Sequence, residues 1–190
     1  MAVSSTMMPL GTPAPPFSLV EPLTGRVVSD GDYAQSALLV MFICNHCPYV
    51  QHIRPGLVQL GRDYAGGALG IVAISANDPG AYPDDAPDQL AQEARAHGYT
   101  FPYLFDETQA VARAYTAACT PDFFLFDAER RLTYRGRFDG SRPGSGVPVT
   151  GADLRRAIDA VLGGEPVPAE QHPSLGCSIK WRRGNEPSYG

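Results

Sequence analysis

The chain has 190 residues, of which 44% are hydrophobic and 18% are charged, and its formal net charge at pH 7 is −5. This composition is typical of a globular protein and excludes an intrinsically disordered chain. The acidic balance argues against nucleic acid or an anionic membrane surface as the main partner. No apolar run approaches the roughly 18 residues that a membrane-spanning helix needs.

The length fits a single domain, for which we expect a folded core over about residues 10–163 and an extended tail over residues 164–190. Residues 1–16 lack the basic and apolar segments of a secretory signal, so we expect a cytoplasmic protein. The four cysteines are too few for a disulfide-stabilised scaffold of this length. In a reducing compartment, cysteines in such number indicate redox chemistry or metal binding.

In chain order, the pattern of apolar residues predicts a hairpin, a strand–helix–strand unit, a helical insert, a short strand, a helix, two antiparallel strands and a last helix. The expected strands cover residues 17–20, 26–29, 37–43, 70–75, 103–105, 123–126 and 131–136, with a turn over residues 119–122. The expected helices cover residues 48–64, 88–97, 107–115 and 151–162, with Asp106 and Thr150 as N-terminal caps. Alternating strands and helices predict an α/β protein with a central mixed β-sheet flanked by helices.

The most informative motif is Cys44-Asn45-His46-Cys47, which follows the apolar run of residues 37–43 and precedes a helical pattern. A cysteine pair at such a junction places one sulfur near the free N–H groups of the helix, where the helix dipole favours thiolate over thiol. The thiolate is the nucleophile in disulfide exchange, and a second cysteine nearby can close a ring and release the partner. We therefore expect dithiol–disulfide chemistry at Cys44 and Cys47.

Three features together resemble the thioredoxin fold, and within it the redoxin branch that includes alkyl hydroperoxide reductase and thiol-specific antioxidant proteins. The first is the cysteine motif at a strand-to-helix junction. The second is Thr120-Pro121 before a buried strand, where this fold places a cis-proline beside the active site. The third is the opening sequence over residues 11–19. The resemblance implies a thioredoxin fold with an N-terminal β-hairpin, a helical insert and a C-terminal tail.

The resemblance also implies roles for individual residues. Cys44, as the more N-terminal and more exposed cysteine, would attack a disulfide, and Cys47 would resolve the mixed disulfide. Thr120 and Pro121 would line the groove where the backbone of a partner pairs. His46 occupies a position from which a cation or donor lowers the pKa of the thiol and makes the disulfide more oxidising. The expected substrates are protein or small-molecule disulfides, with a thiol as electron donor and no cofactor.

The sequence departs from thioredoxin at two places. Val40 and Met41 stand where thioredoxins bury an aspartate that accepts a proton, and no tryptophan precedes Cys44. Glu107 or Asp106 could accept the proton instead, although Asp106 is better explained as a helix cap.

Three alternative functions stay open. A peroxiredoxin-like thiol peroxidase with antioxidant activity belongs to the same branch, but peroxiredoxins carry Thr or Ser three residues before the reactive cysteine, where this chain has Met41. A copper-delivery redoxin would have its cysteines spaced one residue wider. A redoxin that only binds partners would turn over neither disulfides nor peroxides. A zinc site needs four ligands and no second Cys-x-x-Cys exists, so we expect no metal.

The two other cysteines have different expected roles. Cys119 is interpreted as a small core residue, because free cysteine is often buried. Cys177 lies in the segment 175–181, where Ile179 and Trp181 alternate with polar residues and could dock on the domain. If this segment docks near the active site, Cys177 becomes a possible third redox thiol.

Overall fold

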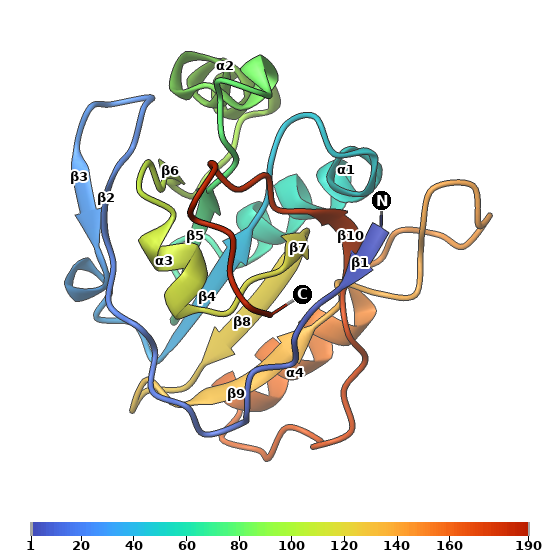
Figure 1. The fold of residues 1–190 in the computed structure, drawn as a ribbon. Coiled ribbons are helices and arrows are strands. Elements are labelled where there is room, and N and C mark those ends of the chain that lie inside the picture. The colour runs from blue at the N-terminus through green and yellow to red at the C-terminus, as the bar shows by residue number, and fades with distance from the viewer. Residues whose placement is uncertain (1, 190) are drawn as a thin grey trace.

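A computed structural model describes residues 2–189 of the chain, which form a seven-stranded mixed sheet with helices on both faces (Figure 1). The strands of this sheet are β2 (Ser18–Val20), β3 (Val27–Ser29), β4 (Ala37–Phe42), β5 (Leu69–Ser75), β6 (Tyr103–Phe105), β8 (Asp122–Phe126) and β9 (Leu132–Gly136). The helices are α1 (Pro48–Asp63), α2 (Pro87–His97), α3 (Ala110–Ala114) and α4 (Ala152–Leu162), with short 3-10 helices at Asp30–Asp32 and Pro83–Asp85. The expected mixed sheet, N-terminal hairpin and helical insert are therefore present.

The strand order in this sheet is β3-β2-β6-β5-β4-β8-β9. At its centre β4 runs parallel to β5 and antiparallel to β8, and β5 runs parallel to β6. Parallel strands bring their carboxyl ends to the same edge of a sheet. The segments that follow β4 and β5, which contain Cys44 and Asn77, therefore emerge side by side.

The central strand β4 supplies both hydrophobic cores of the domain, because successive side chains of a strand point to opposite faces. Leu39 and Met41 belong to the core that contains Leu57 of α1 and Leu154 of α4. On the other face of the sheet, β4 contributes Leu38, Val40 and Phe42. These side chains pack with α3, the N-terminal segment and Ile179 of the tail. This continuous burial explains why the run from residue 37 to residue 43 has no polar residue.

Helix α1 forms where the spacing of apolar residues predicts a helix. Val50, Ile53, Leu57 and Leu60 are buried, as their spacing of three and four residues requires. Tyr64 terminates the helix as its C-cap and is only partly buried. Pro48 is the first helical residue, where the absence of its N–H costs little because this N–H has no intrahelical partner.

Two helix starts differ from the expectation. Helix α3 begins at Ala110 rather than at residue 107, and its N-cap is Gln109 rather than Asp106, whose carboxylate accepts a 2.8 Å hydrogen bond from the Ala112 amide. Helix α4 is preceded by Gly151 at a φ of +67°, a backbone conformation that favours glycine, so Thr150 is not its cap. The amides of Thr150 and Gly151 instead donate to the Asp139 carboxylate, each at 2.7 Å.

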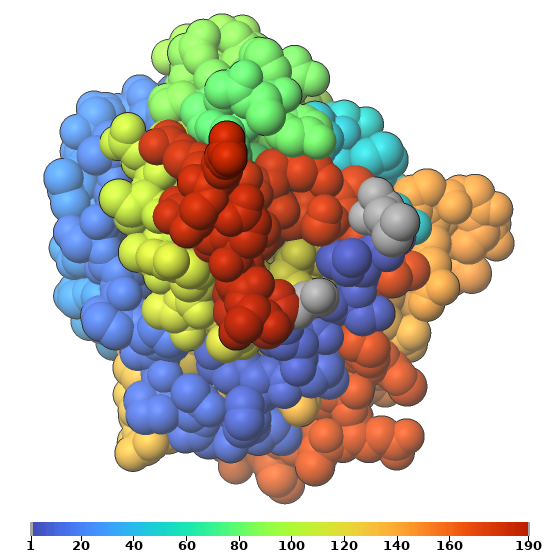
Figure 2. Space-filling view, viewed as in Figure 1, coloured from blue at the N-terminus to red at the C-terminus, as the bar shows by residue number. Residues whose placement is uncertain are grey.

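The C-terminal tail adds a second, three-stranded sheet in the order β1-β10-β7, built from β1 (Ala2–Ser4), β10 (Leu175–Ser178) and β7 (Cys119–Thr120). Cys119 and Thr120 are thus a short strand rather than part of the turn that we expected. Figure 2 shows the tail lying across the surface of the domain, beside the N-terminal strand. None of the helices between residues 2 and 189 is long and apolar enough to cross a membrane.

Asp122 is a charged residue at the first position of β8, and its side chain is fully buried. One carboxyl oxygen, Oδ2, has no hydrogen-bond partner among the described residues. Burial raises the pKa of Asp122 well above its ordinary value, with the Phe123 amide opposing the shift. Because the pKa is higher in the folded than in the unfolded state, the stability contribution of this group is intact below the unfolded-state pKa. It is lost as pH rises through the folded-state pKa.

We therefore predict that Asp122→Asn, which stays neutral at every pH, is more stable than the wild type at pH 8 by about 1–3 kcal/mol. The difference should shrink as the pH is lowered toward 4, and urea unfolding at a series of pH values measures it. The exposed Asp84 provides the control, since Asp84→Asn should change stability little at any pH. A stability difference for Asp122→Asn that stays constant from pH 4 to pH 8 would contradict the assignment.

Candidate active site

The two cysteines lie at the junction of β4 and α1. The amide of Ile43 still bonds to the Ile74 carbonyl at 3.1 Å, so the sheet ends just before Cys44. Cys47 is the N-cap of α1, with Pro48 as the first helical residue. The sulfur of Cys47 therefore lies at the end of the helix where unpaired N–H groups and the helix dipole favour negative charge.

Thr120 contacts both sulfurs. Its hydroxyl oxygen lies 3.1 Å from Cys44 Sγ, and its carbonyl oxygen accepts a 3.2 Å hydrogen bond from Cys47 Sγ. The Thr120–Pro121 peptide bond is cis. The residues expected at the site from the sequence are thus brought together from segments that lie more than 70 residues apart.

The sulfurs are buried, which corrects the expectation that Cys44 is an exposed cysteine. Cys44 is 1% exposed and Cys47 is 0% exposed. The edge of β7 that was expected to accept the backbone of a partner is already paired with β10 of the same chain, with Cys177 opposite Thr120. The groove at Thr120 is thus occupied by the tail.

The ionisations of Cys44 and Cys47 are linked, because each thiol shifts the pKa of the other. The pKa of Cys47 is lowered to about 4: the neighbouring Cys44 is the largest cause, burial opposes the shift, and Cys177 and the Val50 amide add to it. Cys47 in turn raises the pKa of Cys44 well above its ordinary value, and burial and the charge of Asp85 raise it more. The pair therefore holds one proton and one negative charge at neutral pH, with the charge on Cys47 at rest.

The contacts with Thr120 also fit the alternative arrangement, in which Cys47 carries the proton and Cys44 carries the negative charge. A protonated Cys47 donates to the Thr120 carbonyl, and the Thr120 hydroxyl can then donate to a Cys44 thiolate. In line with this, the Thr120 hydroxyl lowers the pKa of Cys44. Passing the proton from Cys44 to Cys47 therefore places the negative charge on Cys44 without bringing a second charge into the interior.

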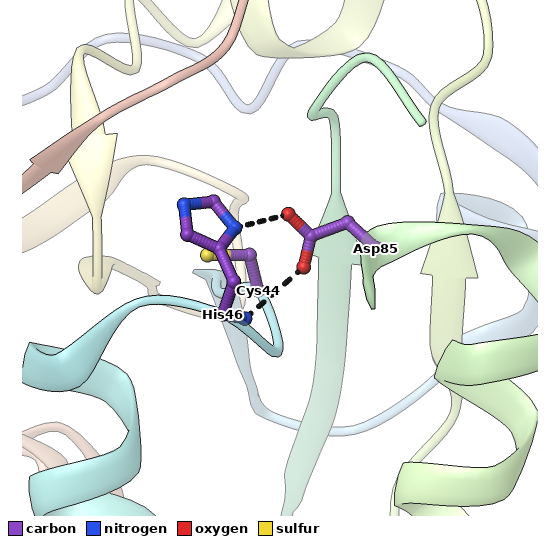
Figure 3. Close-up of side chains that lie close together, drawn as sticks. All are labelled: Cys44, His46 and Asp85. Atoms are coloured by element: carbon purple, nitrogen blue, oxygen red, sulfur yellow. Dashed lines mark hydrogen bonds and ion pairs between the residues drawn. The ribbon is translucent and has the colours of Figure 1, made fainter. Parts of the chain in front are cut away.

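His46 lies beside Cys44 and is held by the insert between β5 and β6 (Figure 3). Its Nδ1 lies 2.5 Å from Oδ2 of Asp85, and its ring stacks on Tyr82 with the ring centroids 4.7 Å apart. The causes of the Cys44 shift do not include His46, so the effect of His46 on the pKa of Cys44 stays a prediction. The charge that acts on Cys44 through this pair is the carboxylate of Asp85, which raises the pKa of the thiol.

Asp85 has no exposed surface and accepts four hydrogen bonds. They come from the amides of Asn45 at 2.7 Å and His46 at 3.3 Å, from Nδ2 of Asn77 at 2.8 Å, and from the His46 ring. A buried carboxylate with this many donors is fixed in place. Asp85 therefore positions both the Cys44–Cys47 loop and the His46 ring.

Ligand atoms of Cys44, His46 and Asp85 lie within 4.8 Å of one another. A soft metal ion prefers sulfur and imidazole ligands, usually four in number. The hydrogen bonds to Asp85 use its lone pairs, and Nδ1 of His46 is engaged with the same carboxylate. The arrangement therefore fits a proton-handling cluster better than a metal centre.

Comparisons with known proteins agree with this geometry. The family model of the AhpC/TSA family matches residues 10–135. The chain belongs to the AhpC/TSA family. The match includes the cysteine motif, Asp85 and Thr120.

Two solved structures are similar to this AhpC/TSA family member over nearly its whole length. An uncharacterized conserved protein from Geobacillus kaustophilus is 52% identical, with a TM-score of 0.94, over 96% of this chain and 97% of that chain. A hypothetical protein from Sinorhizobium meliloti is 51% identical, with a TM-score of 0.93, over 95% and 99% of the two chains.

A thiol:disulfide interchange protein of the thioredoxin family from Chlorobium tepidum is 22% identical, with a TM-score of 0.62, over 80% of this chain and 97% of that chain. This likeness shows that the AhpC/TSA family member has the expected thioredoxin fold. A comparison with curated proteins found no match.

The acid beside the cysteines of this AhpC/TSA family member was missed by sequence reasoning, which considered Glu107 and Asp106. Glu107 is exposed, and the Asp106 carboxylate is used by α3. The acid that the structure places at the site is Asp85. The topology does predict that the loop after β5 lies beside the loop after β4, because the two strands are parallel. Nothing in the loop sequence, however, distinguishes the buried Asp85 from its exposed neighbour Asp84.

We predict that Cys44→Ala moves the ionisation of Cys47 to higher pH, because it removes the hydrogen bond that contributes most to the low pKa. The thiolate absorbance near 240 nm of the reduced protein, followed from pH 3 to pH 9, measures this shift. Cys119→Ser is the control, because Cys119 does not contribute to the low pKa of Cys47. A midpoint in Cys44→Ala equal to that of the wild type would show that the shared hydrogen bond is not the cause.

We also predict that Asp85→Asn lowers the pKa of Cys44, because it removes a nearby negative charge that raises it. The measurement is the pH dependence of Cys44 alkylation, read by peptide mass spectrometry in a Cys47→Ser background where Cys44 titrates without its partner. Asp84→Asn in the same background is the matched control. Slower alkylation of Cys44 in Asp85→Asn than in Asp84→Asn at pH 8 would contradict the prediction.

Proposed function

We propose that the protein is a thiol–disulfide oxidoreductase in which Cys44 attacks and Cys47 resolves. The observation that carries the proposal is the contact of one residue, Thr120, with both sulfurs of a pair that shares a single proton. Membership of the AhpC/TSA family and the thioredoxin fold support redox chemistry at these cysteines.

The exchange starts from the pair with one proton. Cys44 passes its proton to Cys47 as its sulfur attacks one sulfur of the substrate disulfide, and the other substrate sulfur leaves as a thiolate. Cys47 then attacks Cys44, the mixed disulfide breaks, and the proton of Cys47 goes to the second departing sulfur. The substrate disulfide gains two electrons and leaves as one thiol and one thiolate, while the protein ends with a Cys44–Cys47 disulfide.

The surrounding groups lower the cost of each step. The Thr120 hydroxyl can donate to Cys44 as its thiolate forms, and the Thr120 carbonyl accepts from Cys47 once that sulfur is protonated. His46 and Asp85 keep the Asn45–His46 turn fixed through the amides that bond to the carboxylate. Cys44 thus stays in one position relative to Cys47 while charge moves between them.

The test uses the reduced full-length protein and cystamine as a small disulfide. Cys44→Ser should lower the rate of disulfide reduction by about a thousandfold or more, because the attacking sulfur is lost. Cys47→Ser should accumulate a mixed disulfide between Cys44 and half of the cystamine, visible by intact mass spectrometry. Cys119→Ser serves as the control, because this buried thiol lies outside the exchange. Undiminished activity in Cys44→Ser would refute the proposal.

A thiol peroxidase is a second candidate, and one observation favours it. The hydroxyl that peroxiredoxins carry three residues before the reactive cysteine is replaced here by the Thr120 hydroxyl, 3.1 Å from Cys44 Sγ. Stopped-flow mixing with hydrogen peroxide separates the two activities. Formation of sulfenic acid at Cys44 faster than exchange with cystamine would favour the peroxidase.

Protein or small-molecule disulfides as substrates, a thiol as electron donor and a cytoplasmic location belong to this proposal as predictions. The burial of both sulfurs favours small disulfides, because the strand edge at Thr120 is not free for the backbone of a protein substrate while β10 is paired with it.

A further inference from the structure

The tail reaches the redox site as a paired strand. Cys177 of β10 lies opposite Thr120, and Ser178 lies opposite Cys119, in an antiparallel register. The pairing continues beyond the strand, because the Ile179 amide donates to the Ala118 carbonyl at 3.0 Å. Figure 1 shows β10 between β1 and β7, next to the start of α1.

The close approach of β10 to Thr120 depends on Gly176. A Cβ atom built at this glycine would lie 1.9 Å from the carbonyl oxygen of Thr120, and no side chain fits at that distance. This is the carbonyl that accepts the hydrogen bond from Cys47. The strand is therefore shaped to lie directly against the residue that holds both sulfurs.

The chain after β10 is tied to the acid of the site. The Lys180 amide donates to Asn77 Oδ1 at 2.8 Å, and Nδ2 of the same asparagine donates to Asp85 at 2.8 Å. The Lys180 carbonyl accepts hydrogen bonds from the Asp78 amide at 2.8 Å and from Nε2 of Gln109 at 2.9 Å. These bonds fix the register of the tail and hold Cys177 at the site.

Cys177 differs from the other cysteines in its access to solvent. It packs against the core that contains Cys44 and Cys47, and its proximity helps to lower the pKa of Cys47. Cys44, Cys47 and Cys119 are buried, whereas Cys177 is partly exposed. Of the four cysteines, all of which lie within the described residues, Cys177 is the most exposed to solvent.

We propose that Cys177 is a third redox thiol, which takes over the disulfide from Cys44 and passes it to an external thiol donor. The proposal rests on the function proposed above, since it concerns how the Cys44–Cys47 disulfide is reduced again. The donor class is a low-molecular-weight thiol or dithiol, because the strand edge needed to pair with a protein backbone is taken by β10.

The first step is an exchange within the protein. The Cys177 thiolate attacks Cys47 Sγ, a Cys47–Cys177 bond forms, and the Cys44–Cys47 bond breaks. Cys44 leaves with the electron pair and takes up the proton that Cys177 lost. Nothing is oxidised or reduced overall, so this step needs no further reagent.

The second step uses the donor. A donor thiolate attacks the partly exposed Cys177 Sγ, and Cys47 leaves as a thiolate. A second donor thiol then attacks the donor sulfur of the mixed disulfide, and Cys177 returns as a thiol. Two donor thiols become one disulfide, and the two electrons they lose reduce the disulfide of the protein.

The ionisation of these thiols suits this order. The low pKa of Cys47 makes it a good leaving group when the donor attacks Cys177. The pKa of free Cys177 is raised to about 11, first by burial and then by the neighbouring Cys47, while Lys180 lowers it. When Cys47 is part of a disulfide it carries no charge, so its contribution disappears and Cys177 ionises more easily.

The first experiment maps the disulfides. The reduced protein is oxidised with one equivalent of diamide, quenched in acid, alkylated and digested for mass spectrometry. The wild type should contain a Cys47–Cys177 link, and Cys44→Ser should contain more of it, by about tenfold or more, because the competing Cys44–Cys47 bond cannot form. Absence of this link in Cys44→Ser would overturn the proposal.

The second experiment measures the return to the reduced state with glutathione as the donor. Cys177→Ser should be reduced more slowly than the wild type by about tenfold or more, whereas the control Cys119→Ser should match the wild type. Reduction of Cys177→Ser at the wild-type rate would overturn the proposal.

If cystamine is not reduced by the wild type, the proposed function fails. The link in Cys44→Ser still reports on Cys177, because it does not require attack by Cys44.

A third variant keeps the proposal testable if Cys177→Ser does not fold. Gly176→Ala leaves Cys177 in the chain but pushes β10 away from Thr120. Gly140→Ala is the matched control, because no atom lies closer than 3.8 Å to the Cβ it adds. The yield of the Cys47–Cys177 link should fall in Gly176→Ala and not in Gly140→Ala. Equal yields in both would refute the role of the strand.

Discussion

The arrangement of the site depends on the contact of Thr120 with two sulfurs. Its hydroxyl lies against Cys44 and its carbonyl against Cys47, so one residue serves each sulfur in a different protonation state. Its backbone also pairs with β10, opposite Cys177. Because Thr120 sits in a short strand next to the central β8, these contacts are anchored to the most buried part of the sheet.

The burial of the pair limits how much charge it can hold. Two unit charges about 4 Å apart repel by about 4 kcal/mol at an effective dielectric constant of about 20. A single proton shared between Cys44 and Cys47 avoids this repulsion, and the start of α1 stabilises the one charge that remains. Asp85 adds a further negative charge near Cys44, which raises the pKa of that thiol, and its four hydrogen bonds hold the carboxylate in place. The result is a site where a proton moves instead of a second charge appearing.

The sequence predicts the secondary structure well because the strands and α1 are encoded by local patterns. The apolar run at residues 37–43 and the spacing of the buried residues of α1 each reflect burial that a short window reveals. The N-caps of α3 and α4, Gln109 and Gly151, were missed. Both residues have positive φ angles, which the periodicity of apolar residues does not encode. Cys44, Cys47, Thr120 and Pro121 could be found because their spacing follows a known pattern. Asp85 could not, because a loop has no repeat and its position depends on donors from the loops after β4 and β5.

The position of β10 explains how a buried pair can be selective. A segment of the same chain competes for the Thr120 edge at an effective concentration in the millimolar range, so a protein partner must bind more strongly than that to displace it. Small thiols do not need this edge, and in the proposed cycle they react at the partly exposed Cys177 while the strand stays paired. The same pairing that closes the groove to a backbone therefore leaves the redox site connected to solvent through one thiol.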